Sequence, residues 1–126
     1  HLELNKRGVT CIYGDISSVD TLSHAHIEGA KVIVSSITDS ILRGTTNEKI
    51  LRLSKRLCPE AKVIVTANTL KNACALYDYG ADFVYVPRIH SSRYVAEVIL
   101  KSVEGSIEDY RQSEISKLSC RTEVLG

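Results

Sequence analysis

The chain has 126 residues, of which 44% are hydrophobic and 25% are charged, proportions typical of one folded domain with a real core. Its 16 basic and 15 acidic residues nearly cancel, which gives no electrostatic argument for nucleic acid or a lipid surface as partner. No apolar run approaches the roughly 20 residues that span a bilayer, and no secretory signal pattern opens the chain. The four scattered cysteines predict free thiols in the cytoplasm.

Four short runs of β-branched and aromatic residues predict strands, and helical patterns separate them. The runs are Val9–Tyr13, Lys31–Val34, Lys62–Val65 and Asp82–Val86. Apolar strands between helices are typical of a parallel sheet that is covered on both faces. The sequence therefore predicts an α/β fold, with a doubly wound parallel sheet of about four strands and flanking helices.

Five helices are predicted from apolar periodicity and from residues that favour helix ends. The first begins after Ser17 or Ser18, and the third lies between a capping Thr69 and Gly80. Their ranges are 19–26, 47–57, 70–79, 91–103 and 107–118. Residues after Gly105 are more polar, so we expect residues 1–104 to form the domain and 105–126 to form a helical tail or linker.

The ends of the predicted strands hold the candidate binding residues, because ligands of open α/β sheets bind outside the carboxyl ends of the strands. Asp15 follows a glycine there, and a carboxylate in that place can accept hydrogen bonds from an adenine amino group or a ribose hydroxyl. Small hydroxylated residues after the second strand leave room for a ribose. The candidates are Gly14, Asp15, Ile16, Ser35, Ser36, Ile37, Thr38, Asp39 and Thr66.

A purely structural interpretation of these residues stays open. Asp15 could cap the following helix, and Ser35 and Ser36 could bond local backbone. His24 and His26 are two positions apart, do not share a helix face and lack an evident third ligand, so no metal site is predicted. No serine, histidine and acid set and no nucleophile motif is present, so the sequence gives no argument for an enzyme.

Several motifs together resemble a known family. GVTCIYGDISSVDTL, IEGAKVIVSS, NEKILRLSKRLCPEAKVIVTA and LYDYGADFVYVP occur in the order seen in the regulator of K⁺ conductance, or TrkA-type N-terminal, nucleotide-binding domain. The resemblance runs from about Arg7 to Pro87. The stretch SSITDSILRGTTNEKIL, with an insertion before Asn47, is most similar to the variant attached to Kef-type cation:proton antiporters.

The resemblance implies a Rossmann-like regulatory domain on the cytoplasmic side of a K⁺ channel, uptake system or antiporter in the cell membrane. Such domains bind NAD(H) or adenine nucleotides such as ATP, ADP and AMP, and they dimerise. Asp15 would contact the adenine or its ribose, and residues 35–39 would line the nucleotide cleft. Thr66 stands where many members carry an arginine, which weighs against a phosphate contact. His26 replaces a usual glycine, so it must adopt the left-handed conformation or end the helix differently.

The family pattern begins with a strand, a G-x-G-x-x-G turn, a helix and a second strand, and none of these is in this sequence. Because the glycine turn supplies the pyrophosphate site, we expect the chain alone to bind a dinucleotide poorly or not at all. Without that unit, the first strand would move beside the second, or another chain would fill the gap. Bared apolar surface favours association, so a homodimer or higher oligomer is predicted, with residues 89–103 in its interface.

Two other functions were weighed against this regulatory one. A fragment of a nicotinamide-dependent dehydrogenase would need an acid or base near the cleft, and His90 is the only candidate. A response-regulator-like receiver domain would need an acidic cluster, for which Asp15 and Asp39 are too few, and a lysine after a later strand.

Overall fold

The computed structural model describes residues 6, 8, 10–12 and 14–119. Ile12–Arg88 form one compact unit, and the residues from Ile89 onward belong to a second unit. The first contains the sheet with its helices, and the second contains helix α6 (Ile107–Ser119) and all but the first two residues of helix α5 (Pro87–Val103). The predicted domain boundary after residue 104 stays a prediction.

The sheet is parallel and follows the chain order. Strands β1 (Val32–Val34), β2 (Lys62–Thr66) and β3 (Phe83–Tyr85) lie in the order β1-β2-β3. Ile33 pairs with Val63, and Val65 pairs with Val84. Because all neighbours are parallel, helices must carry the chain back between strands. The predicted α/β fold with a parallel sheet and flanking helices is confirmed.

The helices of the sheet unit begin at capping residues. Helix α3 (Asn47–Leu57) follows Thr46, and helix α4 (Leu70–Asp78) follows Thr69; each threonine hydroxyl accepts a bond from a backbone N–H in the first turn. Helix α2 (Val19–His24) follows Ser18, whose side chain makes no such bond. A short 3₁₀ turn, η1 (Ile27–Gly29), leads into β1. The predicted helices 47–57 and 70–79 are thus confirmed within one residue, and 19–26 ends two residues early.

The predicted first strand is not found in its described residues. Thr10–Ile12 have no strand pairing, and Val9 and Tyr13 lie outside the described residues. A strand needs a neighbour to accept and donate its backbone hydrogen bonds, and β1 is bonded to β2 alone. The described sheet therefore has three strands, where about four were predicted.

His26 adopts the left-handed conformation, with φ 53° and ψ 44°. It is the only described residue other than glycine with a positive φ, and such a conformation costs a residue with a Cβ about 1 to 2 kcal/mol. This is one of the two outcomes expected from the replacement of glycine at this position. The turn that it makes ends α2 and directs the chain into η1 and β1.

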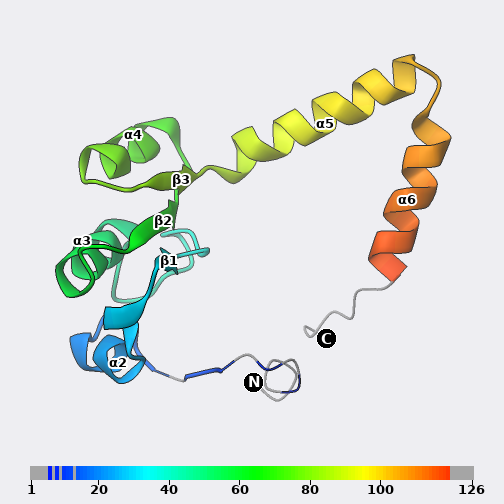
Figure 1. Cartoon of the computed structure of the whole chain (residues 1–126). Helices are drawn as coiled ribbons and strands as arrows, with labels where there is room; N and C mark the ends of the chain where they lie inside the picture. Colours follow the sequence, from blue (N-terminus) through cyan, green and yellow to red (C-terminus); the bar gives the residue numbers. More distant parts are fainter. Residues whose placement is uncertain (1–5, 7, 9, 13, 120–126) are drawn as a thin grey trace. The chain divides into compact units, whose positions relative to one another are not determined.

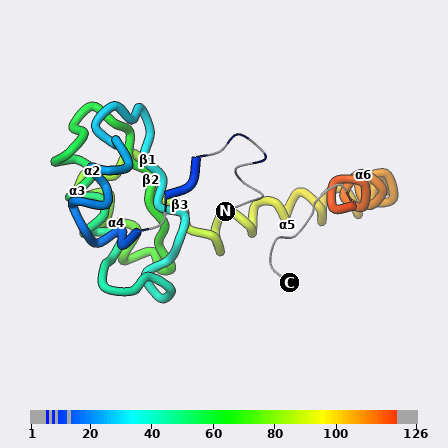
Figure 2. Tube along the Cα trace, turned by 90° about the horizontal axis from the view of Figure 1, so that it is seen from below, coloured from blue at the N-terminus to red at the C-terminus, as the bar shows by residue number. Residues whose placement is uncertain are grey.

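The sheet is covered on one face only within its unit. Helices α2, α3 and α4 all lie on the same side of the strands (Figures 1 and 2). The core forms there, from Leu51, Val63, Val65, Ala67, Ala73, Leu76, Ala81, Val84 and Val86. On the opposite face, side chains of β1 and β3 remain exposed, including Val34 at 59% and Phe83 at 42%. Parallel sheets are usually covered on both faces, but the helices of this unit leave the apolar second face uncovered.

Asp82 ties the entry of β3 to the neighbouring strand and helix. Its Oδ2 atom accepts bonds from Lys55 Nζ at 2.6 Å and from the backbone N–H of Val63 at 2.8 Å. Lys62 Nζ lies 3.2 Å from Oδ1. The hydrogen bond from Lys55, followed by that from Val63, holds the pKa of the Asp82 carboxyl well below its usual range. The carboxylate therefore links α3, β2 and β3 at one end of the sheet.

Helix α5 starts earlier than predicted. The expected range was 91–103, but the helix begins at Pro87, because proline suits the first helical position, where its missing N–H is not needed. It ends before Gly105, whose φ is +79°, and α6 follows. The ring centroids of Tyr94 in α5 and Tyr110 in α6 lie 6.1 Å apart, and hydrogen bonding to Tyr110 raises the pKa of Tyr94. The helix predicted at 107–118 is confirmed.

Replacing Asp82 by asparagine should lower the free energy of unfolding at pH 7 by about 1 kcal/mol, because charge-assisted bonds are lost. The folded pKa lies below the ordinary aspartate value of about 4, so the carboxylate's contribution is complete above that pH and declines as the pH falls below it. Urea unfolding of Asp82→Asn and the unaltered protein at pH 7 and pH 3 checks this. The difference between the two proteins should shrink at pH 3; a constant difference would contradict it.

Candidate functional site

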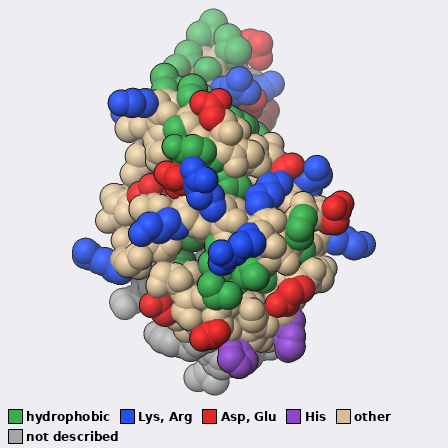
Figure 3. Space-filling model, turned by 90° about the vertical axis from the view of Figure 1, so that its left-hand side faces the viewer, with side chains coloured by type: hydrophobic (Ala, Val, Ile, Leu, Met, Phe, Trp, Pro, Cys, Tyr) green, Lys and Arg blue, Asp and Glu red, His purple; other side chains and the backbone are tan. Residues whose placement is uncertain are grey.

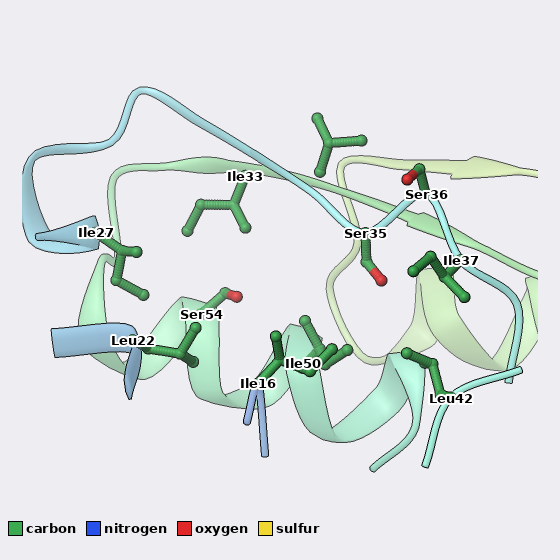
Figure 4. A pocket seen from close by; sticks show the side chains of 11 residues that line it. Ile16, Leu22, Ile27, Ile33, Ser35, Ser36, Ile37, Leu42, Ile50 and Ser54 are labelled. Atoms are coloured by element: carbon green, nitrogen blue, oxygen red, sulfur yellow. The ribbon is translucent and has the colours of Figure 1, made fainter. Parts of the chain in front are cut away.

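A pocket of about 250 Å³ lies between β1, the segment around α2, and the inward face of α3 (Figure 4). Most of its lining is aliphatic, with three serine hydroxyls among the side chains. Figure 4 shows Ile33 on one side, facing Leu22, Ile27 and Ser54 across the hollow. The lining residues are Ile16, Leu22, Ile27, Ile33, Val34, Ser35, Ser36, Ile37, Leu42, Ile50 and Ser54.

Four of the predicted site residues line this pocket: Ile16, Ser35, Ser36 and Ile37. The backbone of Ser35 is fixed on both sides, because its N–H donates to the carbonyl of Ile64 at 2.9 Å and its carbonyl accepts from Thr66 Oγ1 at 2.8 Å. The serine hydroxyl is left to face the hollow (Figure 4). The end of β1 thus presents a polar group at the rim of an otherwise aliphatic pocket.

Asp15 forms the turn that leads into α2. Its Oδ1 atom accepts from the Ser17 hydroxyl at 2.7 Å and from the Ser17 backbone N–H at 2.8 Å. These bonds, the hydroxyl's first, lower the pKa of the exposed Asp15 carboxyl, so it is ionised at neutral pH. Oδ2 has no hydrogen-bond partner among the described residues. One carboxylate oxygen therefore stabilises the turn, and the other can accept a hydrogen bond from a further donor.

Gly14 has a reason within the fold to be glycine. A Cβ atom at this position would collide with the side chain of Thr21 in α2. The turn at residues 14–17 therefore packs closely against α2. This close approach holds Ile16 at the wall of the pocket, next to Ile50 of α3 (Figure 4).

The side chain of Asn47, at the start of α3, connects the segments that surround the pocket rim. It is fully buried. Its Nδ2 donates to the carbonyl of Ile37 at 2.9 Å and to Asp39 Oδ1 at 2.7 Å, and its Oδ1 accepts from the backbone N–H of Thr66. The backbone N–H of Asn47 also donates to Asp39 Oδ1, at 2.7 Å. One amide thus joins the loop after β1, the end of β2 and the first turn of α3.

The remaining predicted residues lie beside the pocket without lining it. Asp39 and Thr66 belong to the Asn47 network, and the Thr38 hydroxyl bonds that of Ser40. Sequence reasoning missed Asn47 and the aliphatic wall. For Ile50 and Ser54 a signal existed, since both lie on the face of α3 that its periodicity turns inward. No local pattern marks a helical asparagine as a tertiary link.

The described residues contain no group of three or more metal-ligating side chains that could hold an ion. Within the same part of the chain, no helix has the length and apolar character needed to cross a membrane.

Comparison with known proteins places the chain in a family. The model of the TrkA-N domain family matches residues 2–87, which include the whole described sheet and the pocket. The chain belongs to the TrkA-N domain family. This confirms the family resemblance drawn from the sequence motifs.

A solved TrkA-N domain has the same fold. The TrkA-N domain of the inner membrane protein ybaL from Escherichia coli superposes with a TM-score of 0.65, at 22% sequence identity, over 76% of this chain and 68% of that one. Among curated proteins, none matches the sequence. The shared TrkA-N fold supports the parallel sheet described above.

Asn47→Ala should lower the free energy of unfolding by about 2 to 3 kcal/mol, because it leaves buried backbone and carboxylate groups without their partner. Chemical denaturation monitored by circular dichroism measures the effect. Asn68→Ala is the matched control, since Asn68 is exposed and makes one long bond of 3.4 Å to Ser40; its effect should stay within about 0.5 kcal/mol. Equal effects of the two changes would show that the network does not stabilise the loop.

Proposed function

We propose that this chain is a nucleotide-sensing regulatory module of a potassium transport protein, and that it acts by a ligand-linked rearrangement of a homodimer. It would lie on the cytoplasmic face of the cell membrane and act on a membrane-embedded transporter of the Kef antiporter type. Its ligand would be NAD(H) or an adenine nucleotide. Regulation requires only that the ligand bind the two states of the transporter with different affinity.

The membership in the TrkA-N family carries this proposal. The solved neighbour, a domain of an inner membrane protein, agrees with a module attached to a membrane partner. The insertion before Asn47 supports the antiporter type, because it resembles that variant of the family. In the structure, Asn47 bonds the loop that precedes it through Ile37 and Asp39.

The pocket suits one part of a nucleotide. Its volume of about 250 Å³ is below the usual range for whole small-molecule ligands, about 300 to 1,000 Å³. A planar base could lie against the aliphatic wall of Ile16 and Ile50, and the hydroxyls of Ser35 and Ser36 could bond a ribose. Asp15 precedes Ile16 in the sequence, and its Oδ2 atom would accept a hydrogen bond from the amino group of adenine. This arrangement favours recognition of the adenosine end.

The dimer is supported by an apolar stripe on α5. Val95, Ile99 and Val103 recur at every fourth position, which places them on one face of the helix. All three are more than half exposed, and Val103 is 82% exposed. Such a stripe on a helix of a folded protein marks a contact surface, and it lies within the predicted interface of residues 89–103.

The alternative of a dehydrogenase fragment has less support. His90, its only candidate acid or base, lies in α5 and does not line the pocket. None of the lining side chains titrates near neutral pH. A binding function therefore fits the pocket better than proton transfer.

Asp15→Ala should abolish adenine nucleotide binding while the fold stays intact, because the change removes the acceptor for the base. Calorimetric titration of the chain with ATP, ADP, AMP, NAD⁺ and NADH measures this and ranks the ligands. Asp20→Ala is the matched control: Asp20 is an exposed carboxylate in the first turn of α2, and its removal should leave affinity unchanged. Equal affinity of Asp15→Ala and the unaltered protein would overturn the role of Asp15.

Ile99→Ser should weaken the dimer at least tenfold, because a polar group replaces apolar surface at the centre of the stripe. Sedimentation velocity over a concentration series gives the dissociation constant. Ile41→Ser serves as control, since Ile41 is 67% exposed in the loop after β1. A chain that stays monomeric at every concentration, or an Ile99→Ser dimer as tight as the original, would contradict the interface.

A further inference from the structure

A second hollow, in which three of the six lining side chains are basic, lies on the outer side of α3. It measures about 380 Å³ and is bordered by the start of α2. Figure 3, which faces this side of the molecule, shows several lysine and arginine side chains gathered over the middle of the surface. We name the hollow the basic groove; its residues are Ser17, Val19, Lys49, Arg52, Leu53 and Arg56.

Three cations of the basic groove share one face of α3. Lys49, Arg52 and Arg56 follow one another at spacings of three and four residues, so their side chains lie in a row. The guanidinium of Arg52 stands 4.3 Å from the centre of the Tyr79 ring and bonds Glu48 at 2.9 Å. In the described part of the chain, no acid pairs with the exposed Lys49 or Arg56. The groove therefore carries a net positive charge, and Val19 and Leu53 add apolar side chains to its lining.

The second unit of the same chain carries a surface of opposite character, at the turn between α5 and α6. We name residues 103–109 the acidic turn. It combines Glu104, Glu108 and Asp109 with two apolar side chains, Val103 and Ile107, which are 82% and 37% exposed. Glu104 pairs with Lys101, and Glu108 pairs with Arg111 and accepts a hydrogen bond from Gln112. All of these contacts are local and exposed, and such pairs contribute little and exchange easily.

We infer that in the dimer the acidic turn of each copy docks in the basic groove of the other. This inference rests on the proposed dimer and names a contact beyond the α5 stripe. Acidic side chains of the turn would meet Lys49 and Arg56, while Val103 and Ile107 would cover Val19 and Leu53. The stripe leads directly to this turn, since Val103 ends the one and begins the other. A two-fold axis forms the same contact twice. The surface buried in the dimer is therefore twice that of one groove.

Two charge-reversed variants test the contact. Lys49→Glu with Arg56→Glu makes the groove acidic, and Glu104→Lys with Asp109→Lys makes the turn basic while it leaves the pair of Glu108 and Arg111 intact. Each variant alone should dimerise at least tenfold more weakly at 0.1 M salt, because like charges then face each other. An equimolar mixture should form a heterodimer close to the original affinity, because both contacts become attractive again.

Sedimentation velocity measures the dissociation constants, and circular dichroism verifies that each variant is folded. Lys31→Glu with Lys71→Glu, an equal charge change at exposed lysines away from the groove, should alter the constant by less than twofold. At 1 M salt, where screening acts within about 3 Å, the differences between variants should largely disappear.

A mixture that associates no better than either variant alone would overturn the contact, as would variants that dimerise like the unaltered protein. The second result would leave the α5 interface standing. Because nucleotide binding is measured separately by calorimetry, loss of this contact and loss of the proposed sensing function are distinguishable.

Discussion

The buried amide of Asn47 is the link on which the geometry of the site depends. It bonds the carbonyl of Ile37 and the carboxylate of Asp39 in the loop after β1, and it also bonds the N–H of Thr66 at the end of β2, which lies 19 residues beyond Asn47 in the sequence. A buried amide with several bonds fixes distances that apolar packing alone leaves adjustable. These bonds hold the rim of the pocket, including Ile37, in place relative to the first turn of α3.

A sheet covered on one side explains both the stability and the associations proposed for this chain. On the helical side, Val63, Val65 and Val84 pack against α3 and α4 and form a dry core. On the other side, Val34 and Phe83 stay exposed, although their strands have the apolar character of a doubly covered sheet. Apolar surface in contact with water is unfavourable. Covering this face with another surface therefore lowers the free energy of the chain.

Much of this fold follows from the sequence, because local signals agree with tertiary structure there. Threonine caps mark α3 and α4, and β-branched runs mark β1, β2 and β3. The run at Val9–Tyr13 has an equally strong strand pattern, yet its described residues form no strand, because pairing depends on a neighbour that no local pattern supplies. The role of Asn47 was hidden for the same reason. Family motifs, by contrast, identified the class of domain before any geometry was known.

Helix α3 gives the two proposed binding regions a shared physical element. Ile50 and Ser54 on its inner face line the pocket, and Lys49, Arg52 and Arg56 on its outer face line the basic groove. A ligand that displaces α3 would move both faces together, since a helix transmits displacement as a rigid body. The coupling must also be reciprocal: if nucleotide tightens the contact between copies, association must tighten nucleotide binding by the same factor. The Asn47 network, at the first turn of α3, is the bonded connection between that helix and the pocket rim.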